Sequence, residues 1–208
     1  MDGLDYTICR TILHMIRGAR VLILKELHGR QYGFLPLSTV EALEISGSTF
    51  PQCVSLSEPL PALRHLCLVL PDWSDDALCY GLTSAGILPQ LQSLKIEGRE
   101  FPPPEILKQL VQLTVLVVRG IATAHSITLP ATLQHFGFHA WAAPPGLRAE
   151  LLVGPLRALP ELRLVTVTPC VRRAVGTALE GMCRNKGVDF GMYEYPEGFQ
   201  QPQHIDWI

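Results

Sequence analysis

Three apolar residues recur along the chain with a fixed spacing, in which the second and third follow the first by three and five positions. The pattern occurs seven times, and successive copies start 20 to 29 residues apart. In a strand, residues two positions apart point to the same side. Each copy therefore predicts a short strand that is apolar on one face. The copies are Ala19/Leu22/Leu24, Val40/Leu43/Ile45, Leu63/Leu66/Leu68, Leu91/Leu94/Ile96, Leu113/Leu116/Val118, Leu133/Phe136/Phe138 and Leu162/Val165/Val167.

The repetition predicts a stacked architecture. An L-x-x-L-x-L strand with a period of ~20 to 29 residues is typical of a leucine-rich repeat. One such unit cannot bury its apolar face alone, whereas parallel stacking with a return segment behind each strand closes a continuous core. We therefore predict an α/β leucine-rich-repeat solenoid, or horseshoe. Its parallel sheet forms the concave face, its returns are short helices or irregular segments, and a helix caps each end.

The segments between and beyond the strands define the predicted helices and the limits of the repeat region. Residues 77–83, 105–110 and 147–153 are expected to be short helical returns, since each follows a capping residue or a proline. The chain is predicted to be one domain of residues 1–208. Its parts are an N-terminal cap helix (1–18), about seven repeats (19–170), a C-terminal cap helix with an edge strand (171–192) and an irregular tail (193–208).

Composition and charge exclude several classes of partner. The chain is 48% hydrophobic and 17% charged, with a formal net charge of −2 and no cluster of Lys or Arg, which argues against nucleic acid. The most apolar short runs, such as residues 21–24, are far below the ~18 residues of a membrane-spanning helix, so no membrane partner is predicted. The charged N-terminal residues do not resemble a signal peptide, so an intracellular location, cytoplasmic or nuclear, is expected.

Motifs for catalysis, cofactors and metals are weak. The six cysteines form no C-x-x-C pair and are predicted to be reduced and structural, and no nucleotide-binding or hydrolase motif occurs. His135 and His139 have the i, i+4 spacing of a helical zinc motif, but four residues of strand span ~13 Å, so no metal site is predicted. His65 and Cys67 would lie ~6.6 Å apart along one strand face. We predict neither an enzyme nor a cofactor, and a cryptic thiol enzyme is the alternative.

The residues that alternate with the buried leucines are predicted to form three columns on the concave face. The first column is Val21, Ala42, His65, Ser93, Val115, His135 and Leu164. The second is Ile23, Glu44, Cys67, Lys95, Val117, Gly137 and Thr166. The third is Lys25, Ser46, Val69, Glu97, Arg119, His139 and Thr168.

Two groups of residues on this scaffold are candidates for binding a partner. Glu97 and Arg119 would be cross-strand neighbours of opposite charge, either as a solvated contact or as part of a polar partner site. Trp73 and Trp141 each follow a strand on one rim, where they either anchor a partner or fold back over the adjacent repeat. The candidate concave-face residues are His65, Lys95, Glu97, Arg119, His135 and His139.

Three units share a fuller pattern, L-P-x-L-x-x-L-x-L, at residues 60–68, 88–96 and 159–167. Together with the closing helix and the following Cys183-Arg-Asn-Lys-Gly-Val-Asp189, they resemble the C-terminal repeat region of fungal F-box proteins. In that family an F-box module docks onto a cullin ubiquitin-ligase adaptor and the repeats hold the substrate. The resemblance implies a substrate-recognition role in ubiquitin ligation. Residues 1–18 are too short for an F-box, so the adaptor is an expected partner only if an F-box is supplied elsewhere.

The sequence therefore predicts a non-catalytic protein–protein interaction scaffold, with a protein partner that the residues do not identify. The alternative is a structural repeat protein that assembles through its rims or ends and has no ligand on its concave face.

Overall fold

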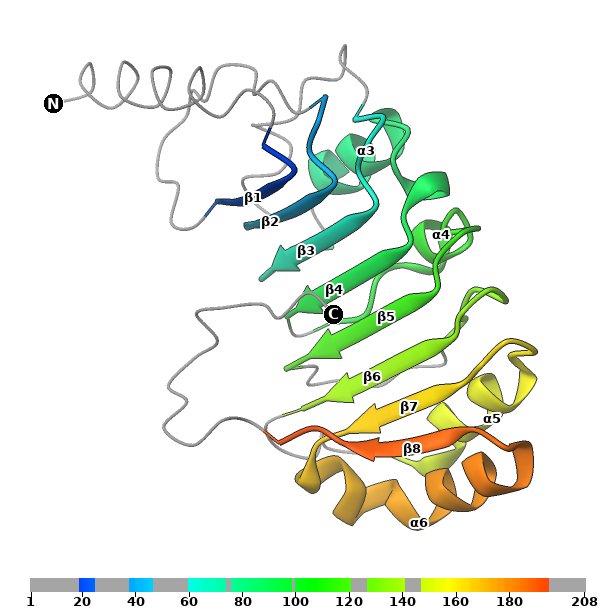
Figure 1. Cartoon of the computed structure of the whole chain (residues 1–208). Helices are drawn as coiled ribbons and strands as arrows, with labels where there is room; N and C mark the ends of the chain where they lie inside the picture. The colour runs from blue at the N-terminus through cyan, green and yellow to red at the C-terminus, as the bar shows by residue number, and fades with distance from the viewer. Residues whose placement is uncertain are drawn as a thin grey trace, which may run out of the picture.

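The computed structural model describes residues 19–24, 38–46, 60–73, 76–98, 100–120, 127–140 and 147–194. Within these ranges, eight parallel strands form one sheet in the order in which they occur along the chain (Figure 1). Each connection therefore leads from one strand to its immediate neighbour. The strands are β1 (Val21–Leu24), β2 (Ala42–Ser46), β3 (His65–Val69), β4 (Ser93–Glu97), β5 (Val115–Arg119), β6 (His135–His139), β7 (Leu164–Val167) and β8 (Asp189–Met192).

The register places equivalent residues of the sequence pattern side by side. Leu22 is paired with Leu43, and the row continues through Leu66, Leu94, Leu116, Phe136 and Val165 to Phe190. From Leu22 to Val165 the side chains of this row are buried. Their removal from water favours folding at about 25 cal/mol for each Å² of apolar surface. The spacing of the apolar residues thus correctly predicts both the strands and their alignment.

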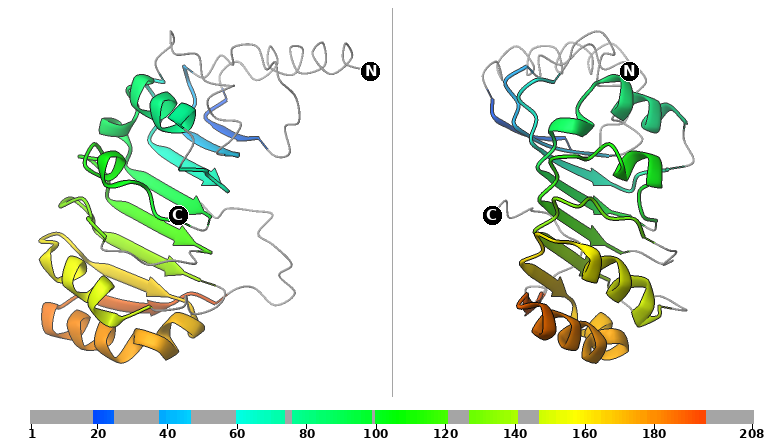
Figure 2. Two further views of the ribbon diagram at one scale, coloured as in Figure 1. Left: turned by 180° about the vertical axis from the view of Figure 1, so that it is seen from behind. Right: turned by 90° about the vertical axis from the view of Figure 1, so that its right-hand side faces the viewer.

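Short helices cover one side of the sheet. In the side view of Figure 2, α3 (Asp76–Ser84), α4 (Pro104–Leu107) and α5 (Ala149–Ala158) lie on the same side, and a 3-10 turn, Leu88–Gln90, precedes β4. α4 begins with a proline and has Glu105 in its first turn, two features that favour helix initiation. The predicted helix at residues 147–153 instead begins at Ala149. Its inward face is formed by Leu152 and Leu156, which are buried in the core.

The C-terminal end of the sheet is closed by α6 (Pro169–Lys186) and β8. α6 has Pro169 in its first turn and ends at Gly187, whose φ of 69° is a left-handed conformation that glycine adopts without strain. The ammonium group of Lys186 donates hydrogen bonds to the carbonyl oxygens of Arg157 (2.9 Å) and Leu159. These contacts join the end of α6 to the end of α5.

A row of carbonyl groups connects consecutive strands where each strand begins. The carbonyl oxygen of Glu41 accepts hydrogen bonds from the backbone N–H groups of both Arg64 (2.8 Å) and His65 (2.9 Å). The carbonyls of Arg20, Arg64, Gln92, Thr114 and Gln134 each accept two N–H groups from the next strand in the same way. For β1 to β6, the residue before each strand thus holds the following strand in register.

These observations establish an α/β protein whose described strands form a single parallel sheet, an arrangement that is compatible with a solenoid. Among the described residues, no helix combines the length and the apolar character needed to cross a membrane. The predicted N-terminal cap helix (1–18), the predicted tail beyond Glu194 and Trp141 lie outside the described residues.

Candidate partner-binding face

The side chains that alternate with the core residues form what we call the front face, the side of the sheet opposite α3, α4 and α5. The register confirms the three predicted columns for the described residues of β1 to β7. Glu97 and Arg119 are cross-strand neighbours, as predicted. Thr168 lies one residue beyond β7, and Lys25 falls outside the described residues.

The second and third columns hold buried polar side chains. Glu44 is 5% exposed, Lys95 8%, Arg119 5% and His139 3%. The prediction treated Lys95, Arg119 and His139 as an accessible polar site, and for these three side chains it is wrong. Burying charged groups costs free energy unless they are paired or hydrogen-bonded. In this structure these side chains are therefore covered, although they lie on the polar side of the sheet.

Burial shifts the pKa values of two second-column side chains, Lys95 and Cys67. It lowers the pKa of Lys95, and the nearby Arg119 charge lowers it further, whereas Cys67, Glu97 and Glu44 act in the opposite direction. Burial also raises the pKa of the Cys67 thiol to about 12. Because the thiolate is the reactive form of cysteine, the Cys67 thiol is not an activated nucleophile.

Two histidines of β6 converge on one hydroxyl group. The Nε2 atoms of His135 and His139 lie 3.1 and 2.9 Å from Oγ1 of Thr166 on β7. The prediction that the spacing along the strand holds the two rings far apart is wrong, because Gly137 lies between them and leaves the space through which they lean together. Burial lowers the pKa of both rings, that of His139 to about 3. Both are therefore neutral at pH 7.

One hydroxyl group cannot bind both neutral rings in the same way. Thr166 donates a single hydrogen, so it donates to one Nε2 atom and accepts an N–H from the other. Within the described ranges, no group of three or more His, Cys, Asp or Glu side chains could hold a metal ion.

A groove of about 300 Å³ follows the first column from β1 to β5. Its floor combines apolar and polar side chains, and Val21 at its β1 end is 54% exposed. First-column residues line it: Val21, Ala42, His65, Ser93 and Val115. The residue before the strand contributes in three cases: Glu41, Gln92 and Thr114. None of these three was predicted as a site residue, although the residue before the first column is polar in all seven copies and could have indicated them.

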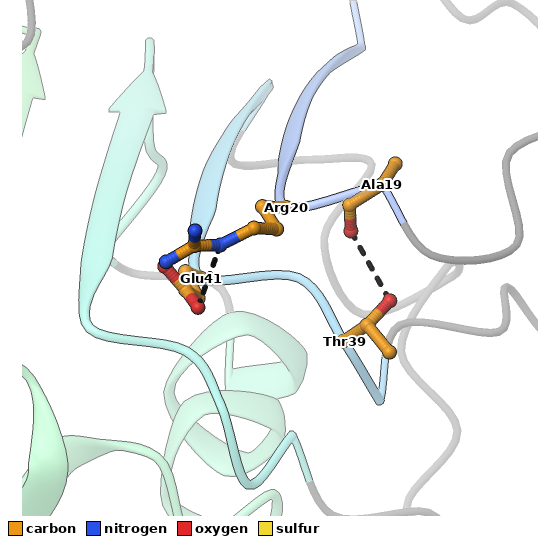
Figure 3. Close-up of polar contacts among 4 residues, drawn as sticks. All are labelled: Ala19, Arg20, Thr39 and Glu41. Carbon is orange, nitrogen blue, oxygen red and sulfur yellow. Dashed lines mark hydrogen bonds and ion pairs between the residues drawn. The ribbon is translucent and has the colours of Figure 1, made fainter.

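An ion pair between Arg20 and the groove residue Glu41 lies near the β1 end of this groove. Arg20 donates two hydrogen bonds to the Glu41 carboxylate, from Nε at 2.9 Å and from Nη2 at 2.6 Å (Figure 3). These bonds hold the pKa of Glu41 below its ordinary value. The hydroxyl group of Thr39 donates to the carbonyl of Ala19 at 3.1 Å in the same region (Figure 3). The contacts join the segments that lead into β1 and β2, so the β1 end of the groove has a defined shape.

The other candidate residues differ in how exposed they are and in whether they line the groove. His65 lines the groove, and Glu97 and His135 are partly buried on the front face. Trp73 packs in the hydrophobic core, and its Nε1 group donates to the carbonyl of Glu100 at 3.3 Å. The prediction of an exposed anchor at Trp73 is therefore wrong, and its alternative, that the indole folds back over the adjacent repeat, agrees with this packing.

Comparison with known proteins assigns neither a family nor a function to this chain. No protein-family model, no curated protein and no solved structure matches the chain.

Proposed function

We propose that the chain is a leucine-rich-repeat solenoid that acts as a non-catalytic protein-interaction scaffold, and that its groove binds an extended segment of a protein partner. The observation that carries this proposal is the groove along the first column, which crosses five parallel strands and lies beside columns whose polar side chains Glu44, Lys95, Arg119 and His139 are buried. Its side chains belong to or adjoin strands rather than mobile loops. A site of this kind is preorganised, so little conformational entropy is lost on binding.

The dimensions and chemistry of the groove fit a short peptide. Four strand spacings of ~4.8 Å separate β1 from β5, a span that about six residues of extended chain cover. Val21 and Val115 offer apolar contacts, while Gln92 and Ser93 offer hydrogen-bonding groups between them. The occupant is therefore expected to combine apolar residues near its ends with hydrogen-bonding residues between them.

The experiment is selection of peptides from a random library on the immobilised protein, followed by affinity measurement against two variants. Ser93→Arg places a long side chain in the groove, whereas Val111→Arg adds the same side chain at an exposed position that does not line it. Selected peptides should lose at least tenfold in affinity for Ser93→Arg and retain their affinity for Val111→Arg. Equal binding to both variants, or failure to select any peptide, would reject the groove as the site.

The resemblance to F-box proteins supports a more specific form of the proposal, in which the bound protein is a substrate of a ubiquitin ligase. A cullin-ligase adaptor would then join only through an F-box supplied elsewhere. Co-purification of cullin-ligase subunits with the tagged protein tests this form. If these subunits are absent from the purified material, the ligase role is rejected, whereas the proposal of a peptide-binding scaffold is unaffected.

A further inference from the structure

Tyr193 covers two of the buried polar side chains of the front face. Its ring stacks on His139, with ring centres 4.1 Å apart and an interplanar angle of 11°. Its hydroxyl oxygen accepts a hydrogen bond from Nη2 of Arg119 at 2.8 Å. The residue that makes these contacts follows β8, whereas Arg119 and His139 belong to β5 and β6. The C-terminal side of the chain thus returns across β7 to reach the third column.

The groups that receive Tyr193 belong to neighbouring central strands. Arg119 and His139 are paired with each other in the register of neighbouring central strands. The His139 ring has a second contact, because its Nε2 atom lies 2.9 Å from the Thr166 hydroxyl oxygen. Both side chains are more than nine-tenths buried. The receiving surface therefore consists of side chains from two neighbouring central strands, and Tyr193 contributes to the burial of both.

The receiving surface also specifies the chemistry of its occupant. The flat face of the neutral His139 ring accepts an aromatic ring by stacking. The Arg119 guanidinium carbon lies 5.0 Å from the centre of the Tyr193 ring, and its Nη2 atom donates to the oxygen at the end of the ring. A phenol provides both the ring and the acceptor. A phenylalanine side chain provides only the ring.

Tyr193 itself is attached to the sheet at its edge. Its backbone N–H donates to the carbonyl of Val167 at 2.8 Å. The four residues of β8 before it are all partly or fully exposed, and Glu194 after it is exposed. Contacts at an edge strand open at lower free-energy cost than those of central strands. The occupant is therefore more easily displaced than the surface that receives it.

We propose that Arg119 and His139 form a binding site for the phenol ring of a tyrosine, that Tyr193 fills this site in the isolated chain, and that a tyrosine of a peptide ligand can replace it. This site lies on the third column, whereas the groove of the proposed function follows the first. Either proposal can therefore be refuted without affecting the other. The Ser93→Arg variant leaves the phenol site intact.

Removal of Tyr193 should create a site for free phenols. The Tyr193→Ala variant is expected to bind 4-methylphenol in isothermal titration calorimetry and to gain thermal stability as the site fills. Toluene should bind at least tenfold more weakly, because it cannot accept the hydrogen bond from the charged Arg119 donor. The matched control is Tyr80→Ala, which removes an exposed tyrosine on α3 and should bind neither compound. Equal binding of toluene and 4-methylphenol, or equal binding by the two variants, would overturn the proposal.

Displacement is tested in the intact chain with its tyrosine retained. With 3-fluorotyrosine at position 193, addition of N-acetyl-tyrosinamide should shift the ¹⁹F resonance towards that of an exposed tyrosine, whereas N-acetyl-phenylalaninamide should not. A resonance that neither compound moves would show that Tyr193 is a fixed part of the fold, and would refute displacement. This measurement stands even if Tyr193→Ala does not fold.

Discussion

Mild acid should destabilise the protein through its buried histidines. In the folded chain His139 is neutral, because burial first, and then the charges of Arg119, His135 and Lys95, lower its pKa to about 3. In the unfolded chain the same ring has its ordinary pKa near 6.5. The unfolded state therefore binds more protons below pH 6.5. Stability is fully present above that pH and falls as the pH decreases towards 3.

The size of this effect follows from the two pKa values. Between pH 7 and pH 5, one such histidine lowers the free energy of unfolding by about 2 kcal/mol. That is a substantial part of the 5 to 15 kcal/mol by which a typical domain is stable. Burial also lowers the pKa values of His65 and His135, so their contributions have the same sign and add to that of His139.

Urea unfolding at pH 7 and pH 5 measures the effect, with His139→Gln as the test variant. The amide of glutamine can retain the hydrogen bond to Thr166 but does not titrate. The loss of stability between the two pH values should be about 2 kcal/mol smaller in this variant than in the wild type. His65→Gln is the comparison, since His65 is less buried and should remove less of the dependence. Equal losses in wild type and His139→Gln would refute the reasoning.

Two further substitutions test local geometry by urea unfolding. Leu70 is 68% exposed and has a φ of 49°, which is unfavourable for any residue except glycine, so Leu70→Gly should stabilise the protein by up to about 1 kcal/mol. Destabilisation would show that the exposed side chain contributes to folding. In Gly137→Ala, the new Cβ would lie 3.1 Å from His139 Nε2, Thr166 Oγ1 and a Val117 methyl, so we expect a loss of about 1 to 3 kcal/mol. An unchanged midpoint would show that the two histidines move apart freely.

The sheet could be predicted because its information is local and repeated. The spacing of Leu63, Leu66 and Leu68 specifies one strand, and the same spacing in the next copy aligns Leu94 with Leu66. Parallel stacking in chain order then places every column. No information from a distant part of the chain is needed for that step.

The character of the front face could not be predicted in this way, because it depends on contacts across the fold. Arg119 contacts Tyr193, 74 residues further along the chain, and no short pattern connects the two. The convergence of His135 and His139 requires a glycine between them and a threonine on the next strand. Trp73 follows its strand like a rim residue, but its burial depends on the segment around Glu100.

Before each of the strands β1 to β6, a backbone carbonyl accepts two N–H groups from the next unit, and this shared contact makes the units of the fold interchangeable. Thr114 presents its carbonyl to Gln134 and His135 just as Gln92 presents its own to Thr114 and Val115. Excision of one period, such as residues 93–114, would bring the carbonyl of Gln92 to the pair of donors that Thr114 serves in the intact chain. The number of units is therefore free to change by duplication or deletion without new backbone chemistry at the junction, and the length of the groove would change with it.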